Sequence, residues 1–390
     1  MNTQDLAYVR TKFEPARPAP MSNLGLVVWL RRHLFATVGD TVLTLLGIAF
    51  LVWALPNLYN FLIGDAVFAA ENGDACRAAN VGACWAYVWA RLDFFLYGFF
   101  PADPYWKEQA GLFAEFMAQW RVNLVFFIGL ALVVPLLWPS APFKVVNAAL
   151  FFIVYPVVVF YLLAGGAFGL EKVPTEKWGG LTITLIIGLV GIVTSLPLGI
   201  LLALGRQSRL PAIKYLSTGF IELWRAVPLI TVLFMASVML PLFMPSGVTI
   251  DKLLSALVGI ALFNSAYMAE VVRGGLQALP RGQYEAASSL GLNYWKSMFF
   301  IILPQALKHV IPGIVNTFIA LFKDTSLVSI IGIFDLLKTV QSSTADLDWT
   351  APTQAITGYI FAAAVFWIFC FSMSRYSIFM ENRLHTGHKR

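Results

Sequence analysis

The sequence YEAASSLGLNYWKSMFFIILPQA, Tyr284–Ala306, lies between two strongly apolar runs and differs from both. Its polar start contains Glu285, and Gly291 and Pro304 divide the remainder. Glycine permits the positive φ that ends a helix, proline interrupts one, and Pro280 just upstream is suited to a first helical turn. The stretch therefore predicts a helix–turn–helix hairpin that joins two membrane spans.

The composition of the whole chain is that of a membrane protein. Of its 390 residues, 59% are hydrophobic and 12% are charged, whereas about 25% are charged in a soluble domain. The apolar residues come in runs of about 20, the length at which a helix spans a hydrocarbon core of about 30 Å. We therefore predict an all-α polytopic membrane protein. The net charge of +6 is interpreted as a topology signal rather than as a sign of nucleic-acid binding.

Eight transmembrane helices are predicted from these runs. They cover residues 36–63, 122–138, 145–170, 179–204, 215–243, 253–273, 307–333 and 355–380. Segment 24–35 is apolar but short and contains Arg31 and Arg32, so we expect an interfacial helix there. Residues 1–20 show no signal peptide and are expected to form a disordered tail. Lysine and arginine favour the loops assigned to the inside, which predicts that both termini are cytoplasmic.

The long loop 64–121 is then periplasmic and contains Cys76 and Cys84. An oxidising compartment favours a disulfide that closes a small loop, and two free thiols are the alternative. Cys370 falls in the last span and is expected to be a small core residue. The four histidines are scattered, so no metal site is predicted.

Two interpretations of the hairpin follow from its residues alone. Small side chains at Ala286 and Ala287 let another surface approach the helix backbone closely, and Glu285 lies in the first turns, where the helix dipole favours an acid. These features suit a rigid cytoplasmic docking site. The alternative is an ordinary amphipathic connection between two spans.

The hairpin resembles the EAA loop of ABC importer permeases, both in its residues and in their spacing. The matching anchors are Glu285, Ala286, Ala287, Gly291, Ile301, Leu303 and Pro304. Other segments are similar to the polar amino-acid uptake branch of these permeases. They are Ala269–Ala278 (AEVVRGGLQA), Pro280–Gln283, the set Glu222, Arg225 and Pro228, and Phe322–Leu327 (FKDTSL).

The resemblance covers about residues 180–380 and implies a type I importer core of five helices. The implied segments are a cytoplasmic tail and interfacial helix (1–35), a three-helix N-terminal extension (36–170), the importer core (171–384) with its coupling loop (274–306), and a cytoplasmic end (385–390). The long N-terminal half resembles the permease subunits of general L-amino-acid transporters of the Aap/Bzt type.

The resemblance also implies the partners of this chain in a bacterial inner membrane. The EAA hairpin would be the coupling helix seated on a cytoplasmic ATPase dimer, which would hold ATP and Mg. A periplasmic binding protein would deliver an L-amino acid, and a second, different permease would complete the pathway. Because the chain has no Walker A motif and no set of catalytic residues, we expect a transport subunit without a cofactor of its own. A narrower glutamate/aspartate or glutamine permease and an ATPase-independent secondary carrier are the alternatives.

Charged residues inside the predicted spans are candidates for the substrate pathway. Glu222 and Arg225 are three residues apart on one helical face and can pair. Counted along a straight span, Arg225 lies about 15 Å deep, and Pro228 is expected to kink the helix. Either Arg225 attracts a substrate carboxylate, or the two residues form a structural ion pair.

A second polar patch falls in the seventh span and consists of Lys323, Asp324, Thr325 and Ser326. It predicts a broken helix whose freed backbone groups line a cavity. Its lysine and aspartate either contact a zwitterionic amino acid or satisfy each other.

Four further polar positions complete the prediction for the spans. Asn264 is a weaker pathway candidate, together with Ser265, and is expected to form an interhelical hydrogen bond. Glu270 and Arg273 are three residues apart at the predicted cytoplasmic boundary. Their spacing predicts a salt bridge that braces the hairpin, and contact with the substrate is the alternative.

Overall fold

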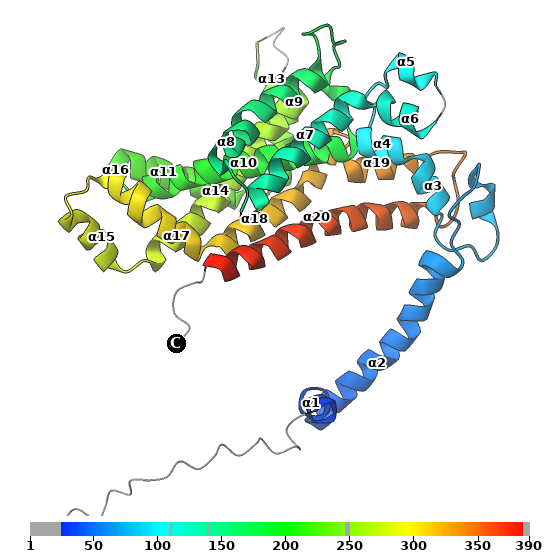
Figure 1. The fold of residues 1–390 in the computed structure, drawn as a ribbon, viewed down its shortest axis with the longest axis horizontal. Helices are drawn as coiled ribbons and strands as arrows, with labels where there is room; N and C mark the ends of the chain where they lie inside the picture. The colour runs from blue at the N-terminus through cyan, green and yellow to red at the C-terminus, as the bar shows by residue number, and fades with distance from the viewer. Residues whose placement is uncertain (1–24, 110, 139, 246–249, 385–390) are drawn as a thin grey trace, which may run out of the picture. The chain divides into compact units, whose positions relative to one another are not determined.

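The computed structural model describes residues 25–109, 111–138, 140–245 and 250–384. Its contacts divide the chain into two compact units, Met1–Ala66 and Val67–Arg390. Helices make up nearly all the regular structure of the described residues (Figure 1), which confirms the predicted all-α class. The predicted tails, 1–20 and 385–390, lie outside the described residues.

The first unit contains α1 (Leu26–His33) and α2 (Val38–Tyr59), which continues as the π turn η3 (Asn60–Gly64). Thr37 begins α2 with a capping box, in which its hydroxyl oxygen accepts a hydrogen bond from the Asp40 N–H at 3.1 Å. None of the residues of α2 is buried, as expected of an apolar helix that lies in lipid. The predicted helix in 24–35 is confirmed as α1, and its place on the membrane stays a prediction.

The described residues contain seven helices long and apolar enough to cross a bilayer, and a bent pair of helices counts as the eighth span. These agree with the eight predicted spans. In the second unit the straight ones are α7 (Trp120–Leu137), the run of α8 (Lys144–Ala149), η5 (Leu150–Val154) and α9 (Tyr155–Ala164), α10 (Gly180–Arg206), α14 (Lys252–Ala278), α18 (Ile311–Asp324) with η9 (Thr325–Ile331), and α20 (Gln354–Leu384).

The fifth span is the bent pair. It consists of α11 (Pro211–Ala226), α12 (Leu229–Phe234), η7 (Met235–Met239) and α13 (Leu240–Leu242), with a bend of 101° after Ala226. Val227, which precedes Pro228, has an extended backbone with ψ of 135°, because a residue before proline is pushed out of the helical region. The kink predicted at Pro228 is confirmed, and its angle is large enough to turn the two halves of the span nearly perpendicular to each other.

The centre of the second unit is the pair α10 and α14. A side chain at Gly199 of α10 would come within 2.7 Å of the Met268 side chain, so the absence of one lets the helices approach closely. The hairpin α15 (Arg281–Ser289), α16 (Tyr294–Ser297), η8 (Met298–Ile302) and α17 (Leu303–His309) lies at one end, which we call the hairpin end. The other, the loop end, holds α3 (Trp85–Ala90), α4 (Leu92–Tyr97) and α19 (Leu336–Ser343) (Figure 1).

From Val67 onward, the described part of the predicted loop 64–121 is folded and packs against α19 and α20. It contains η4 (Gly73–Arg77), α3, α4, α5 (Pro104–Lys107) and α6 (Leu112–Ala118). Tyr87 is fully buried and hydrogen-bonds Ser343 of α19, and Arg91 forms an ion pair with Asp346. The segments before and after the boundary predicted at residue 170 therefore pack together. The boundary itself stays a prediction of where the segment that resembles the importer core begins.

Candidate functional site

The first arm of the hairpin is α15, which follows Pro280 and ends at a glycine turn. Gly291 has φ of +71° and its N–H donates to the Ser288 carbonyl at 2.9 Å, while the Leu292 N–H donates to the Ala287 carbonyl at 3.3 Å. These two bonds form a Schellman motif, in which a left-handed residue satisfies the last carbonyls of a helix. The helix stop predicted at Gly291 is confirmed.

Contacts on both sides hold α15 against the bundle. The Tyr284 hydroxyl donates to the Leu276 carbonyl of α14 at 3.2 Å, and Gln305 Nε2 of α17 donates to Gln283 Oε1 at 3.1 Å. Ala287 is buried, with 1% of its surface exposed. Burial also raises the pKa of Tyr284, which keeps its phenol neutral and able to donate. The first arm of the hairpin is therefore fixed to the end of α14 and to α17 of the second arm.

The second arm consists of three segments, whereas one helix interrupted at Pro304 was predicted. The α16 helix begins at Asn293, whose side chain accepts from the Lys296 N–H at 2.9 Å. The chain then widens into the π turn η8 and returns to α-helix in α17. Pro304 lies in the first turn of α17, where its missing N–H costs no hydrogen bond. Leu303 is buried in the hydrophobic cluster that joins this arm to α10, α11 and α14.

Several side chains of both arms of the hairpin are exposed among the described residues. Glu285 and Ala286 are exposed on α15. Leu290 is 74% exposed, and Trp295 and Phe300 of the second arm are 56% and 76% exposed. Large apolar side chains exposed on a rigid element are typical of an interaction surface.

Glu270 of α14 is the centre of an ion-pair cluster at the hairpin end. Its carboxylate lies 2.6 Å from Arg206 Nη1, 2.6 Å from Arg273 Nη2 and 3.7 Å from Arg225 Nη1. Only 16% of the Glu270 side chain is exposed. The predicted Glu270–Arg273 bridge is confirmed. The cluster joins α10, α11 and α14 beside the hairpin.

The predicted pairing of Glu222 with Arg225 is wrong. Glu222 Oε1 lies 2.9 Å from Arg206 Nη2, whereas Arg225 faces Glu270 and the ring of Tyr267, whose centroid is 5.7 Å away. Residues three apart on a helix can also reach a neighbouring helix, and here they do. Arg206, the last residue of α10, was missed because the sequence suggests only a loop charge that follows an apolar run.

The bend in the fifth span also removes the basis for the predicted depth of Arg225. That depth counted residues along a straight helix. Because α11 and α12 meet at 101°, the number of residues along α11 does not give the depth of Arg225 along the direction of α12. Arg225 belongs instead to the cluster around Glu270.

The patch Lys323–Ser326 lies where α18 changes to the 3-10 helix η9. The predicted break is thus a change of helix type. The Thr325 hydroxyl donates to the Phe322 carbonyl at 2.7 Å, and the Ser326 hydroxyl donates to the Lys323 carbonyl at 2.9 Å. Lys323 is exposed and Asp324 is half-buried. The ion pairs within the described residues do not include one between them, so the prediction of a self-satisfied pair is wrong.

Asn264 is buried, but its hydrogen bond stays within its own helix. Its Nδ2 donates to the Ile260 carbonyl at 3.0 Å, and the neighbouring Ser265 hydroxyl donates to the Leu262 carbonyl at 2.7 Å. The expectation of an interhelical bond is therefore wrong. A one-turn separation lets a short polar side chain bond its own backbone, which the sequence does not distinguish from an interhelical contact.

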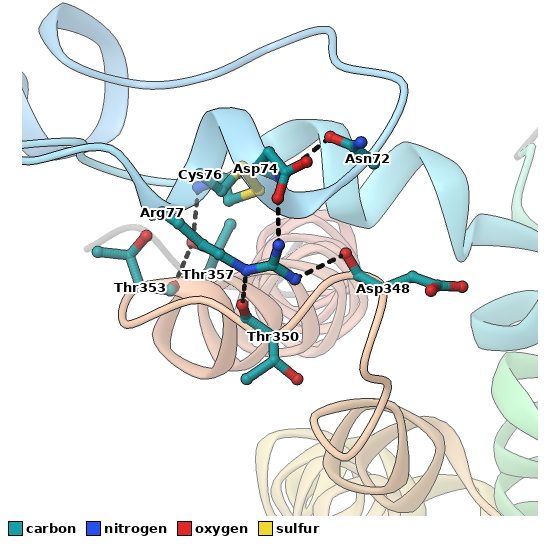
Figure 2. The surroundings of a disulfide bond; sticks show 9 residues. Asn72, Asp74, Cys76, Arg77, Asp348, Thr350, Thr353 and Thr357 are labelled. Carbon is teal, nitrogen blue, oxygen red and sulfur yellow. Dashed lines mark hydrogen bonds and ion pairs between the residues drawn. A yellow bond between two sulfur atoms is a disulfide. The ribbon is translucent and has the colours of Figure 1, made fainter.

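Cys76 and Cys84 form a disulfide, with their Cα atoms 5.7 Å apart (Figure 2). The predicted pair is present, and the alternative of two free thiols is not. Cys370 is free and half-buried.

The disulfide loop is anchored to the segment before α20. Arg77 Nε donates to the Thr350 carbonyl at 2.8 Å, and its Nη2 donates to the Asp348 carbonyl at 3.2 Å (Figure 2). The Cys84 N–H donates to the Thr357 hydroxyl of α20 at 3.0 Å. A loop far away in sequence thus fixes the connection between α19 and α20.

Comparison with known proteins identifies the family. The family model "Binding-protein-dependent transport system inner membrane component" matches residues 195–385, which include the hairpin and the cluster around Glu270. The inner membrane amino-acid ABC transporter permease protein YhdY of Escherichia coli is 52% identical over 96% of this chain and 97% of its own. The glutamate/glutamine/aspartate/asparagine transport system permease protein BztC of Rhodobacter capsulatus is 38% identical over 99% of this chain and 100% of its own.

Among solved structures, an amino acid ABC transporter crystallised with histidines is similar to this chain at 30% identity. The match has a TM-score of 0.46 and covers 52% of this chain and 92% of that one. The two permeases above are similar to this chain over nearly its whole length. The chain therefore belongs to the amino-acid ABC transporter permeases, inner membrane subunits of binding-protein-dependent transport systems.

Proposed function

We propose that this chain is the transmembrane subunit of an ABC importer that takes up L-amino acids delivered by a periplasmic binding protein. The observation that carries the proposal is the similarity, over almost the whole chain, to two permeases named for amino-acid transport. The name of BztC includes four amino acids, which favours a broad substrate range over a narrow glutamate/aspartate or glutamine permease. An ATPase-independent carrier is set aside because both relatives are transport-system permeases.

The hairpin is the proposed coupling element. Glu285, Ala286 and the turn at Gly291 would contact a cytoplasmic ATPase dimer that holds ATP and Mg. Buried Ala287, together with Leu303 and Pro304, would keep the two arms rigid. The exposed apolar side chains of the hairpin support this assignment, since a partner would cover them. The cluster around Glu270 would transmit movement of the hairpin to α10, α11 and α14.

The remaining assembly follows from the same proposal. Both termini would be cytoplasmic in a bacterial inner membrane, and the loop end would be periplasmic. A second, different permease would complete the pathway. Residues 36–170 would be an extension added to the importer core 171–384, since the family match begins at residue 195.

Two groups of residues are the proposed substrate contacts. Arg225 is held to Glu270 only at 3.7 Å, so its guanidinium retains donors for a substrate carboxylate. In the second group, Lys323 and Asp324 supply opposite charges that are not paired with each other among the described residues. Glu222, Asn264, Thr325 and Ser326 are weaker candidates, because each has a hydrogen bond or ion pair within the chain.

The test uses the assembled transporter in proteoliposomes with its binding protein. Glu285→Lys or Gly291→Val should abolish uptake and ATPase stimulation while the chain remains folded. Gly282→Ala is the matched control, because Gly282 has no neighbour within 4 Å of an added Cβ and no positive φ. Unchanged uptake by both hairpin variants would overturn the coupling assignment.

A second set of variants tests the pathway. Arg225→Ala and Lys323→Ala should raise the amino-acid concentration needed for half-maximal ATPase stimulation, with the melting temperature of the complex retained. Competition of labelled glutamate uptake by a panel of L-amino acids measures the range. If selectivity and turnover both stay normal in the two variants, these residues are structural.

A further inference from the structure

A cavity of about 260 Å³ lies at the loop end, in the part of the chain that precedes the family match. Its walls come from the segment that leads into α5, from the start of α7 and from the turn that follows α9. The residues that carry the argument are Phe100, Asp103, Gln119, Trp120, Arg121 and Glu171. None of them belongs to the hairpin or to the proposed substrate pathway.

Gln119, in the wall of this cavity, has an unsatisfied acceptor. Only 8% of the residue is exposed, and its Nε2 donates to the Phe100 carbonyl at 3.3 Å. Its Oε1 is buried and has no hydrogen-bond partner among the described residues. Buried amide oxygens without a donor are rare in folded proteins. An N–H donor from outside the chain would satisfy this atom.

Asp103 adds a carboxylate with spare acceptor capacity. Its Oδ1 accepts from the Tyr105 N–H at 3.1 Å, and its Oδ2 accepts from Trp120 Nε1 at 3.2 Å. Each carboxylate oxygen has two lone pairs, so both can accept another hydrogen bond. The ion pairs found in the described part of the chain do not include Asp103. Glu171 also lines the cavity, and its negative charge interacts with the Arg121 guanidinium.

Arg121 does not neutralise both carboxylates. Its Nε donates to the Leu162 carbonyl at 2.6 Å and its Nη1 to the backbone carbonyl of Glu171 at 3.1 Å. The guanidinium also lies over the Phe100 ring, 5.4 Å from its centroid. Two carboxylates and one guanidinium leave the cavity with a net negative charge, and its free hydrogen-bonding groups are mainly acceptors.

We propose that this cavity binds a primary ammonium group. An ammonium has three N–H donors and one positive charge, which suits the Gln119 amide oxygen and the Asp103 carboxylate. The N–H groups of Arg121 that are not bound to the carbonyls of Leu162, Leu163 and Glu171 would donate to the anion of a zwitterionic ligand. Trp120 is the first residue of α7, one of the helices long and apolar enough to cross a bilayer, so the cavity lies where that span begins. The ammonium comes either from a phosphatidylethanolamine headgroup or from a free amine such as an amino acid.

The experiment separates the two sources with N–H-free counterparts. The assembled transporter is purified and native mass spectrometry measures retention of phosphatidylethanolamine against phosphatidylcholine, whose trimethylated nitrogen has no N–H. Ligand-observed NMR then measures ethanolamine and glycine against choline, with the transporter in phosphatidylcholine nanodiscs. Asp103→Asn and Gln119→Leu are the test variants. Glu108→Gln, an exposed carboxylate outside the cavity wall, is the matched control.

The wild type and Glu108→Gln should retain phosphatidylethanolamine, or bind ethanolamine or glycine, in clear preference to the choline counterpart. Each test variant should weaken that binding about tenfold, as expected for loss of a hydrogen bond to a charged group. A lipid preference assigns the headgroup, and a preference seen only for ethanolamine or glycine assigns a free amine. Melting temperatures confirm that the variants are folded. Asp103 also caps α5, so Gln119→Leu provides a variant in which that cap is kept. Equal binding of choline compounds, or equal ammonium binding by wild type and both folded variants, would overturn the proposal.

Discussion

Replacing Glu270 by glutamine should cost this protein more stability than any other single charge removal at the hairpin end. The carboxylate interacts with Arg206 of α10, Arg225 of α11 and Arg273 of its own helix α14. Glutamine keeps one acceptor oxygen but removes the negative charge. Three arginines would then lie close together with only Glu222 to balance them.

The magnitude follows from burial. Removing one partner from a fully buried ion pair costs about 3–5 kcal/mol. The arginine side chains here are 25%, 35% and 30% exposed, so water screens part of the repulsion and we expect about 2–3 kcal/mol. Glu222→Gln is the matched control. That side chain is 55% exposed and pairs only with Arg206, so its removal should cost about 0–1 kcal/mol.

The assay is thermal unfolding of the assembled transporter in nanodiscs at one fixed scan rate, because membrane complexes unfold irreversibly. For the unit Val67–Arg390, the unfolding entropy scales to about 0.7 kcal/mol/K, so Glu270→Gln should lower the melting temperature by about 3–4 °C. Glu222→Gln should lower it by about 1 °C or less. Equal shifts for the two variants would refute the view that Glu270 holds the three helices together.

Three further predictions concern the loop end. Burial raises the pKa of Asp335 to about 6. The folded protein therefore holds the carboxyl proton more tightly than the unfolded chain does. The stabilisation from this proton is complete below about pH 4 and is lost as the pH rises through 6. In the wild type the free energy of unfolding should decline by about 3 kcal/mol between pH 4 and 7. Asp335→Asn keeps the cap of α19 and should remove this decline. Parallel plots of melting temperature against pH for wild type and variant would contradict the prediction. Replacing Cys76 and Cys84 by serine opens a loop with a sequence separation of 8 and should lower the local free energy of unfolding by about 2–3 kcal/mol. The loss is measured as faster amide exchange in residues 73–90, and unchanged exchange would contradict the prediction. Gly98→Ala should lower the free energy of unfolding by at least about 2 kcal/mol, since φ is +64° and the new Cβ would lie 2.4 Å from the backbone just before α10. Gly166→Ala is the control, with φ of +78° and open space, and should lower it less. Equal melting temperatures for the two variants would refute the steric argument.

The spans and the hairpin could be predicted because their signals are local. An apolar run of about 20 residues has no stable alternative to a helix in lipid. Gly291 ends α15 because its own backbone permits a positive φ, and Cys76 and Cys84 are close enough in sequence to pair. The same local signals supplied the EAA spacing from Glu285 to Pro304, and thereby the family.

The pairings between helices could not be predicted in the same way. Helical periodicity places Glu222 and Arg225 on one face, but it does not say which helix covers that face. Arg206 competes for Glu222 only because α10 ends where α11 and α14 meet, and that meeting depends on the 101° bend. The cavity beside Gln119 likewise needs segments about 50 residues apart to lie side by side.

The sequence by itself determined that this protein is helical, that it crosses a membrane, and that it displays a hairpin of the importer type. Hydrophobic run length, glycine and proline act within a few residues, so the chain carries these signals openly. Only the tertiary structure decided which arginine pairs with which carboxylate, how the fifth span bends, and that the long N-terminal loop is folded against α19 and α20. Those outcomes depend on charges and surfaces that meet across distant segments, where the free energy of each contact is set by the neighbours that bury it.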